Sequence, residues 1–485
     1  MKRLPHNFSA FTTDLYELTM ACGYWRAGVS DHEAVFHVTF RENPFGGQFT
    51  VACGLGTAID FLREFRFSEE EVDYLAAQRG NDGKPLFDAG FLDYLRSLQL
   101  SCDIDAVPEG TLVFPNEPLL RVRGPIIEGQ ILETALLNIF NFQSLIATKA
   151  ARICLAAQSD AVIEFGLRRA QGPDGGLTAA RAAYIGGCAG TSNLEAGRLF
   201  GIPVSGTQAH SWIMFFEGER EAFSAYARAM PNNCVFLVDT YNSIEGIRHA
   251  IEAAAQLRKE GHDLIGVRLD SGDRVALSVQ ARRMLDEAGL ANAKIVCSGD
   301  LDEYAIAEMK RRGAKIDVWG VGTRLATGHP DGALTGIYKL GAVRSPGSQW
   351  QYRIKLSDDL AKTSVPGSLQ VRRFHHASGK FIADAIYETN HPPAQPCSVV
   401  NLETGEQTEI PAGTDSSDLL TPIFRAGKPV CSAPEIAASR EHARQQLRCA
   451  PAEILDLTKP VPYKIGLEKS LYDLRSTLVA RATNK

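Results

Sequence analysis

Aspartates stand at regular intervals in the middle of the chain, each at the end of a short apolar segment. Asp239 ends CVFLVD, Asp270 ends LIGVRLD and Asp300 ends KIVCSGD, at spacings of 31 and 30 residues. Thr240 and Ser271 place a hydroxyl directly after the first two. Carboxylates and hydroxyls in this arrangement suit Mg²⁺ held partly through water, or the hydroxyl groups of a ribose.

Arg268 lies two positions before Asp270. On a strand, residues two apart point to the same side, which in a barrel is the interior. A buried arginine without an anionic partner costs much free energy. Arg268 therefore contacts either an anionic ligand or Asp270 in an internal ion pair, and the local sequence leaves both interpretations open.

Two adjacent arginines, Arg168 and Arg169, follow a predicted strand in EFGLRRAQGPDGG (164–176). The forked guanidinium group binds carboxylate or phosphate oxygens in pairs, so these residues are candidate ligand contacts. The alternative is that they lie on the surface and pair with Glu164 or Asp174.

Thr207 and His210 lie in SGTQAHSW (205–212), a turn that follows a strand-like segment. Histidine titrates near neutral pH and can act as a nucleophile or as a proton carrier. A single histidine is more often structural, so both interpretations of His210 stay open on local sequence.

Two turns carry little side-chain bulk. Ser298 and Gly299 lie in CSGDLDE (297–303), and Gly322 and Thr323 lie in WGVGTRLATG (319–328). Free backbone N–H groups in such turns bind anions, and the late strand-to-helix loops of barrels are the usual phosphate site. The alternative is a tight turn without a ligand.

The elements that position these residues repeat along the chain. Short apolar segments predict strands at 161–166, 234–239, 264–270, 294–300 and 317–323, and helical periodicity follows at 242–261, 271–289 and 300–313. Repeated strand–helix units predict a parallel sheet, closed as a TIM-like barrel or open and doubly wound. We favour the barrel. In both architectures the ligand site lies at the carboxyl ends of the strands.

The flanking regions differ in pattern. Residues 1–125 contain short strands and turn signals, which predicts an α+β sandwich-like domain, and 126–345 form the barrel domain. Residues 346–430 are predicted to pack back on the first domain, and 431–485 to form a helical segment.

Composition excludes several classes of protein. The 485 residues carry a net charge of −6, which argues against nucleic acid as a partner. Ten cysteines show no zinc-ligand spacing, so no structural metal is expected.

Residues 131–148 are apolar but interrupted by polar side chains, so we expect a core helix and no membrane contact. Since no long apolar stretch follows the charged start, no signal peptide is expected, and the predicted location is cytoplasmic with reduced thiols. Neither a P-loop nor a dinucleotide-binding glycine motif is present.

Several ordered strings together resemble the nicotinate phosphoribosyltransferase family. These strings are TDLYELTMACGYW (13–25), FRENPFGGQF (40–49), EFGLRRAQGPDGG, GTQAHSW, DTYNS, GVRLDSGD, SGDLDE, GVGTRLATG and KTSVPGSLQVRR (362–373). The resemblance implies a type II phosphoribosyltransferase fold, an irregular α/β barrel with an accompanying α+β sandwich-like domain. It also implies a homodimer with shared active sites. The implied reaction joins nicotinic acid to 5-phosphoribosyl 1-pyrophosphate with Mg²⁺ and coupled ATP hydrolysis, giving nicotinate mononucleotide and pyrophosphate for NAD salvage.

The resemblance also implies roles for individual residues. Tyr16 resembles the residue that stacks on the nicotinate ring, supplied by the neighbouring subunit, and His210 resembles the histidine that ATP phosphorylates. It further implies that Arg168, Thr207 and Arg268 bind nicotinate, and that Gly322 and Thr323 bind the 5-phosphate with help from Ser298 and Gly299. Strand-end chemistry adds Asp270 as a substrate contact and Asp239 as a catalytic residue, together with Arg268 and His210.

The sequence leaves three alternatives open. Nicotinamide is a rival substrate, although Arg168 and Arg268 favour the acid. A phosphosugar isomerase or aldolase would need a lysine or glutamate at a strand end, where this chain offers Asp, Arg, Ser and Gly. A non-catalytic sensor on the same fold would bind the activated sugar without releasing pyrophosphate.

Overall fold

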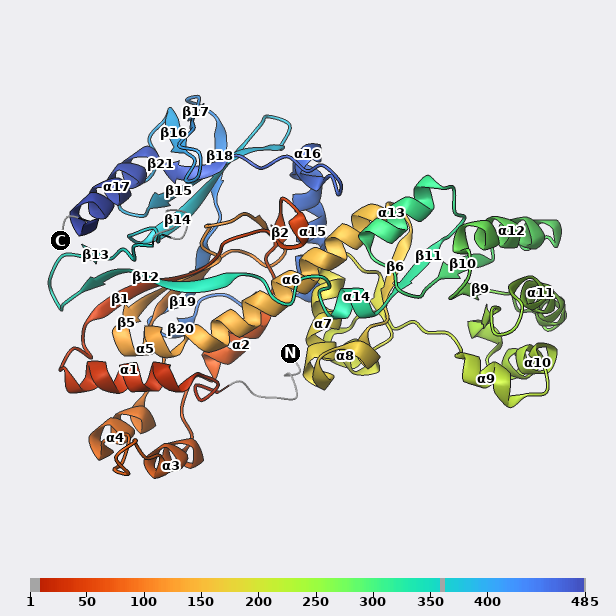
Figure 1. The fold of residues 1–485 in the computed structure, drawn as a ribbon, viewed down its shortest axis with the longest axis horizontal. Helices are drawn as coiled ribbons and strands as arrows, with labels where there is room; N and C mark the ends of the chain where they lie inside the picture. The colour runs from red at the N-terminus through yellow and green to blue at the C-terminus, as the bar shows by residue number, and fades with distance from the viewer. Residues whose placement is uncertain (1–8, 358–362, 484–485) are drawn as a thin grey trace. The chain divides into compact units, whose positions relative to one another are not determined.

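The repeated strand–helix region folds as one of two units in the computed structural model, which describes residues 9–357 and 363–483 (Figure 1). We call residues 146–332 the central unit, and residues 9–145 with 333–483 the flanking unit. The division falls inside helix α6 (Glu133–Ala157).

The central unit is built on a six-stranded parallel sheet with the order β7-β6-β11-β10-β9-β8. Its strands are β6 (Ala161–Glu164), β7 (Gly190–Thr191), β8 (Val235–Leu237), β9 (Gly266–Leu269), β10 (Lys294–Cys297) and β11 (Val318–Val321). Its helices, besides the end of α6, are η2 (Leu167–Arg169), α7 (Gly172–Ile185), α8 (Leu194–Phe200), α9 (His210–Phe215), α10 (Glu219–Ala229), η3 (Pro231–Asn233), α11 (Ser243–Lys259), α12 (Arg274–Glu287), α13 (Glu303–Arg311) and α14 (Thr323–Ala326).

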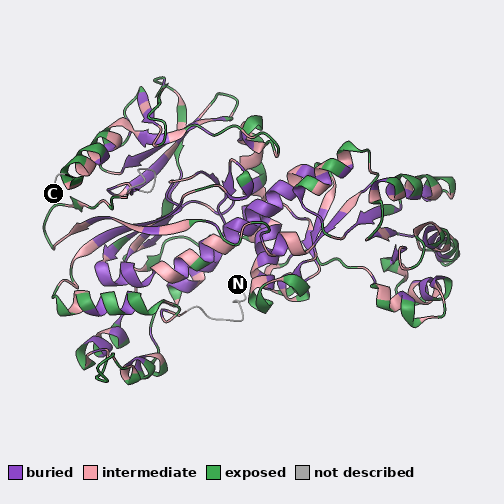
Figure 2. Cartoon of the chain, in the orientation of Figure 1, coloured by how far each residue is buried: buried purple, intermediate pink, exposed green. Residues whose placement is uncertain are grey.

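The predicted repeat is confirmed. Helices α11, α12 and α13 follow β8, β9 and β10, and each is followed by a glycine with positive φ, at Gly261 (+82°), Gly289 (+70°) and Gly313 (+85°). Glycine adopts this left-handed conformation without a Cβ clash, which ends the helix. Helices α11 and α12 cover the sheet with their apolar faces and leave the opposite faces exposed (Figure 2).

The sheet is parallel as predicted, but closure into a barrel is not confirmed. In the residues that the structure describes, the edge strands β7 and β8 are not paired with each other. Beyond β6, strand β7 has only an isolated parallel bridge, from Thr191 to Val204. The predicted place of the ligand site is the same in both architectures, because the carboxyl ends of parallel strands share one edge in open and closed sheets alike.

The flanking unit joins segments that are far apart in the sequence. Strands β1 and β12 pair antiparallel, and so do β3 and β19, so C-terminal strands complete a sheet of N-terminal ones. The seven-stranded sheet has the order β13-β12-β1-β5-β3-β19-β20, a six-stranded sheet has the order β17-β16-β21-β15-β14-β18, and β2 pairs with β4. The predicted domain limits at residues 125, 345 and 430 stay predictions.

The elements of the flanking unit before α6 are α1 (Leu15–Arg26), β1 (Glu33–Phe40), η1 (Pro44–Gly46), β2 (Thr50–Val51), α2 (Leu55–Arg63), α3 (Glu69–Ala77), α4 (Ala89–Ser97), β3 (Asp103–Ala106), β4 (Leu112–Val113), β5 (Leu120–Pro125) and α5 (Ile126–Ile131). Those after the central unit are β12 (Gly336–Arg344), β13 (Gln351–Tyr352), β14 (Leu369–His375), β15 (Phe381–Glu388), β16 (Cys397–Val400), β17 (Gln407–Ile410), β18 (Asp415–Asp418), β19 (Thr421–Arg425), β20 (Lys428–Pro429), α15 (Ile436–Cys449), α16 (Ala452–Leu455), β21 (Ile465–Glu468) and α17 (Lys469–Thr483).

One helical stretch, Ile126–Ala157, is long and apolar enough by length and composition to cross a membrane. In the structure, 67% of its most apolar window is buried by the rest of the protein. Burial of this kind is typical of a core helix, which is what the interrupted apolar run predicted.

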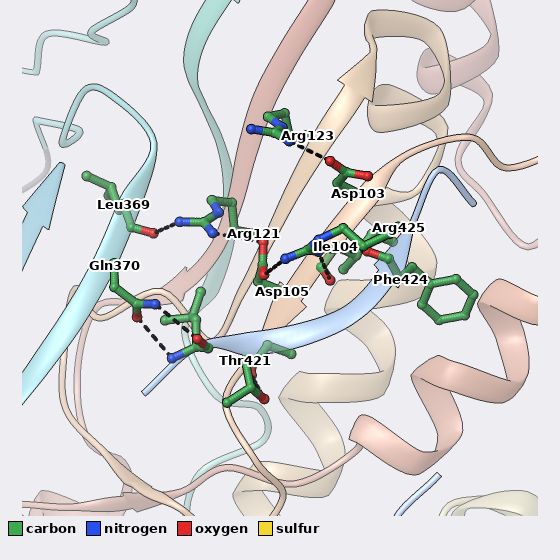
Figure 3. Close-up of polar contacts among 12 residues, drawn as sticks. Asp103, Ile104, Asp105, Arg121, Arg123, Leu369, Gln370, Thr421, Phe424 and Arg425 are labelled. Carbon is green, nitrogen blue, oxygen red and sulfur yellow. Dashed lines mark hydrogen bonds and ion pairs between the residues drawn. The ribbon is translucent and has the colours of Figure 1, made fainter. Parts of the chain in front are cut away.

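Ion pairs to a buried aspartate link strands of the seven-stranded sheet. Figure 3 shows Asp105 on β3 between two arginines: it accepts from Arg121 Nη2 at 2.8 Å and from Arg425 Nη2 at 2.5 Å. Arg121 also donates to the carbonyl oxygen of Leu369 at 2.8 Å. The N–H group of Leu369 in turn donates to Nε2 of His37, at 3.0 Å. These bonds join β14 of the six-stranded sheet to β1 and β5 of the seven-stranded sheet.

His37 should make the protein sensitive to acid. Burial, with a smaller contribution from the charge of Arg121, lowers the pKa of His37 from 6.5 to about 3. Below pH 6.5 the His37 side chain binds a proton in the unfolded chain but not in the folded chain. The contribution of neutral His37 to the free energy of unfolding is therefore complete above pH 6.5 and falls as the pH drops toward 3. Between pH 7.5 and 5 we expect a loss of about 2 kcal/mol in the free energy of unfolding.

Urea unfolding at the two pH values measures this loss. In His37→Gln, which keeps an acceptor for Leu369 but does not titrate, the difference between the two pH values should shrink by the same amount. His376, exposed in the same unit, provides the control variant His376→Gln. Equal pH dependence in the wild type and His37→Gln would contradict the assignment.

Candidate active site

A hollow of about 450 Å³ lies at the carboxyl ends of β6, β9, β10 and β11, within the central unit. It is lined by Phe165, Arg168, Arg169, Arg268, Asp270, Ser271, Gly272, Arg274, Ser298, Gly299, Asp300, Gly320, Gly322 and Thr323. Four of these residues are arginines and two are aspartates. The excess of cationic groups suits an anionic ligand.

Arg268 on β9 connects three loops of the site. Its Nε donates to Ser298 Oγ at 2.8 Å and its Nη1 to Thr207 Oγ1 at 2.9 Å. Its Nη2 donates to Asp270 Oδ1 at 2.8 Å. The internal ion pair considered above is therefore present. The guanidinium also lines the hollow, and its contact with an anionic ligand stays a prediction.

The two strand-end aspartates have different surroundings. Burial raises the pKa of Asp270, but the hydrogen bonds from Ser298 and Arg268 outweigh it, and the net pKa lies below its ordinary value. Asp239 Oδ2 accepts from the N–H of Asp270 at 2.9 Å and from Ser271 Oγ at 2.7 Å. Asp239 thus ties the end of β8 to the end of β9, and Asp270 is a carboxylate at neutral pH.

Arg168 and Arg169 are exposed in η2 and line the hollow. Within the part of the chain that the structure describes, neither makes an ion pair, so the surface pairing considered from the sequence is wrong. Glu164 is buried instead and accepts from the N–H of Gly166 and from Thr191 Oγ1. Burial raises the pKa of its carboxyl group above the ordinary value. Both guanidinium groups are available to a ligand.

Two glycines of the hollow, one in the turn after β10 and one in strand β11, leave no room for a Cβ. Gly299 has φ +87°, and a Cβ there would lie 2.4 Å from the carbonyl oxygen of Asp270. A Cβ on Gly320 would lie 2.6 Å from the ring of Phe165. Ser298 and Gly299 therefore bring bare backbone into the hollow, and Thr323 begins α14 beside them.

His210 begins α9, next to Thr207 and Gln208 in the loop that precedes it. Its Nδ1 lies 3.1 Å from Thr240 Oγ1, just after the end of β8. Thr207 contacts Arg268 directly, and Asp239 contacts Asp270. Through Thr240, His210 lies at the same edge of the sheet as these residues.

Tyr16 lies in the flanking unit, on the exposed side of α1, with 48% of its surface accessible. Desolvation, with a hydrogen bond to Glu17 and nearby carboxylates, raises the pKa of its phenol well above the ordinary value. The predicted contact of Tyr16 with a nicotinate ring stays a prediction.

Two side chains of the lining, those of Phe165 and Arg274, were not predicted from the sequence. Phe165 packs its ring 5.9 Å from the guanidinium carbon of Arg268, and Arg274 Nη1 donates to the carbonyl oxygens of Ser298 (2.8 Å) and Gly299. Phe165 lies in EFGLRR (164–169), where only the two arginines were candidate ligand contacts. Arg274 begins a helix and gives no signal in the sequence.

The carboxylates of the hollow fit a Mg²⁺ ion only as partial ligands. Among the described residues there is no group of three or more His, Cys, Asp or Glu side chains that would hold a metal ion. Asp270 and Asp300 line the hollow, and Asp239 Oδ1 is buried without a hydrogen-bond partner. Mg²⁺ usually takes one or two carboxylates and completes its shell with water and substrate phosphates, so these residues fit the ion in that mode.

Comparison with solved structures defines the class of protein. The fold superposes on human nicotinic acid phosphoribosyltransferase with a TM-score of 0.84 and 34% sequence identity, covering 96% of this chain and 99% of that chain. It also superposes on nicotinate-nucleotide pyrophosphorylase from Pyrococcus furiosus, with a TM-score of 0.67, 24% identity and coverage of 91% and 95%. The fold is that of the type II phosphoribosyltransferases.

Sequence comparison defines the family within that class. Three family models match: the nicotinate phosphoribosyltransferase N-terminal domain at residues 11–141, the nicotinate phosphoribosyltransferase family at 161–343, and its C-terminal domain at 369–475. Nicotinate phosphoribosyltransferase of Bacillus subtilis is 39% identical, covering 95% of this chain and 93% of that one. The enzyme of Bos taurus is 35% identical, with coverage of 97% and 96%. The chain belongs to the nicotinate phosphoribosyltransferase family, and the resemblance seen in the sequence is confirmed.

Proposed function

We propose that this protein joins nicotinic acid to 5-phosphoribosyl 1-pyrophosphate, giving nicotinate mononucleotide and pyrophosphate, as a step of NAD salvage. The observation that carries the proposal is the hollow itself, in which cationic side chains and bare turns surround one aromatic ring. Family membership supports the same reaction.

The pyridine acid fits at the Phe165 side of the hollow. The Phe165 ring offers a flat apolar surface, and Gly320 leaves it room. The Arg268 guanidinium beside the ring supplies charge for the carboxylate, with Arg168 nearby in the lining. A neutral amide gains less from two cationic groups, so the site favours nicotinic acid over nicotinamide.

The activated sugar fits over the turns after β10 and β11. Backbone N–H groups near Gly299 and Gly322, with the hydroxyl groups of Ser298 and Thr323, suit its 5-phosphate. Bound Mg²⁺, held by Asp270 and Asp300, would neutralise the pyrophosphate, and Asp239 orients this edge through Asp270.

The transfer needs little covalent help from the protein. The pyridine nitrogen forms a bond to the anomeric carbon as the bond to the pyrophosphate oxygen breaks, through a cation-like transition state. The protein orients both reactants, which is worth on the order of 7–11 kcal/mol of the barrier. Arginines of the lining stabilise the charge that develops on the leaving pyrophosphate.

ATP coupling is proposed to act through His210. When Nδ1 of His210 donates to Thr240, Nε2 keeps its lone pair and can accept the γ-phosphoryl group of ATP, with ADP leaving. The phosphorylated ring would place negative charge beside Asp270 and Arg268, which biases the loops that they hold. We further propose a cytoplasmic homodimer whose partner subunit supplies Tyr16 to the ring.

A pyrophosphate-release assay with and without ATP tests the function. With nicotinic acid and the activated sugar we expect stoichiometric pyrophosphate and nicotinate mononucleotide, with ATP increasing the yield. Nicotinamide in place of the acid should give at least a tenfold lower kcat/KM. Binding of the sugar without pyrophosphate release would overturn the proposal in favour of a metabolite sensor.

A further inference from the structure

Two segments supply the bare-backbone part of the hollow: the loop of residues 298–302 after β10, and residues 320–324, which span the end of β11 and the start of α14. We call both anion-binding loops. An ion pair joins them, because Arg324 Nη1 donates to Oδ2 of Asp302. The Asp302 side chain is 9% exposed and that of Arg324 is 39% exposed. Neither is among the residues that line the hollow, so the pair lies behind its surface.

Asp302 also fixes the start of the helix that follows its loop. Its Oδ1 accepts from the N–H of Ala305 at 2.8 Å, which makes Asp302 the N-cap of α13. Burial raises the pKa of Asp302, but the hydrogen bonds from Ala305 and Arg324 outweigh it and leave the pKa below its ordinary value. The carboxylate is therefore charged at neutral pH and binds both partners at once.

The next residue, Glu303, holds the same helix end to α6. Glu303 is fully buried; its Oε1 accepts from Arg152 Nε at 2.9 Å, and its Oε2 lies 2.5 Å from Lys149 Nζ. The start of α13 is thus held against α6, and the loop before it has little freedom to shift. Through Arg324, the start of α14 is bound to the same end of α13.

We propose that Asp302 and Arg324 are a positioning pair that sets the spacing between the two anion-binding loops, and so the affinity for the phosphorylated sugar. The inference rests on the proposed function, since it takes these loops as the site of the 5-phosphate. A phosphate that receives hydrogen bonds from two loops needs both placed within about 0.5 Å of the binding geometry. A charged pair between the loops, with its carboxylate largely buried, provides that constraint without touching the ligand.

Variants of the pair should raise the KM for the activated sugar selectively. In Arg324→Met, Asp302 loses its cationic partner while it stays mostly buried, so we expect at least a tenfold higher KM for the sugar, with kcat and the KM for nicotinic acid within threefold of wild type. Asp302→Asn keeps an acceptor for the helix cap and should shift the same KM less. Arg324→Lys, which keeps the charge, should recover part of the loss.

A double variant and a second measurement separate positioning from general damage. If the two residues act as one unit, Asp302→Asn with Arg324→Met should be no worse than Arg324→Met alone. Calorimetric titration with ribose 5-phosphate should show the same tenfold weakening in Arg324→Met, independent of catalysis. The control is Arg311→Met on α13, which removes an exposed pair with Glu308 and should leave every parameter at the wild-type value.

The results distinguish this inference from the proposed function. An Arg324→Met protein with the kinetics of Arg311→Met would overturn the pair's role, and so would an equal loss for both substrates with unchanged ribose 5-phosphate binding. If the wild type releases no pyrophosphate while Arg324→Met still weakens ribose 5-phosphate binding, the proposed reaction fails and the positioning pair stands.

Discussion

Arg268→Ala should lower kcat/KM for nicotinic acid by at least a hundredfold, which corresponds to about 2.7 kcal/mol of transition-state stabilisation. The guanidinium lines the hollow and donates to three side chains at once, those of Thr207, Asp270 and Ser298. Its removal takes away the charge that meets the substrate and also loosens the loops that surround it. Steady-state kinetics with each substrate varied in turn measure the loss.

Two further variants separate charge from geometry in this prediction. Arg268→Lys keeps the positive charge but has a single ammonium group, which does not reproduce the forked contacts, so we expect an intermediate loss. Arg283→Ala on α12 removes an arginine that is 80% exposed and pairs with Glu287, and it should behave as wild type. Wild-type kinetics in a folded Arg268→Ala protein would remove Arg268 from the site.

The fold of the central unit followed from local pattern because each βα unit is nearly self-contained. Asp239, Asp270 and Asp300 each mark the end of a strand or the turn just after it, and a parallel sheet places all such ends on one edge. Arg268, Ser298 and the other residues that line the hollow therefore lie at that edge, and no long-range information is needed to predict this. Spacing alone was sufficient there.

Other features depend on contacts that local pattern does not carry. Strand β1 pairs with β12, about three hundred residues later, and nothing in either segment specifies the other. Phe165 matters because Gly320, on another strand, leaves room for its ring, and Arg274 matters because two carbonyl groups of a different loop face it. Barrel closure likewise depends on pairing between the two edge strands, and their local sequences are as compatible with an open sheet as with a closed barrel.

His210→Ala should abolish the ATP hydrolysis that nicotinic acid and the activated sugar stimulate, while ATP-independent transfer continues. The ring is the acceptor of the phosphoryl group in the proposed coupling, whereas the groups that hold the two substrates, such as Arg268 and Thr323, stay in place. We expect the stimulated ATPase to fall at least a hundredfold and transfer without ATP to stay within tenfold of wild type.

Labelling with ATP that carries a radioactive γ-phosphate gives a second measurement of the same prediction. The wild type should retain acid-labile label, as a phosphorylated imidazole does, and His210→Ala should retain none. Thr240→Val removes the partner of Nδ1 and should slow phosphorylation without abolishing it, because Nε2 remains in place but the ring is no longer held in one orientation. His376→Ala, at an exposed histidine of the flanking unit, is the matched control and should label as wild type. Unchanged ATPase in His210→Ala would show that the energy of ATP enters the reaction through another group.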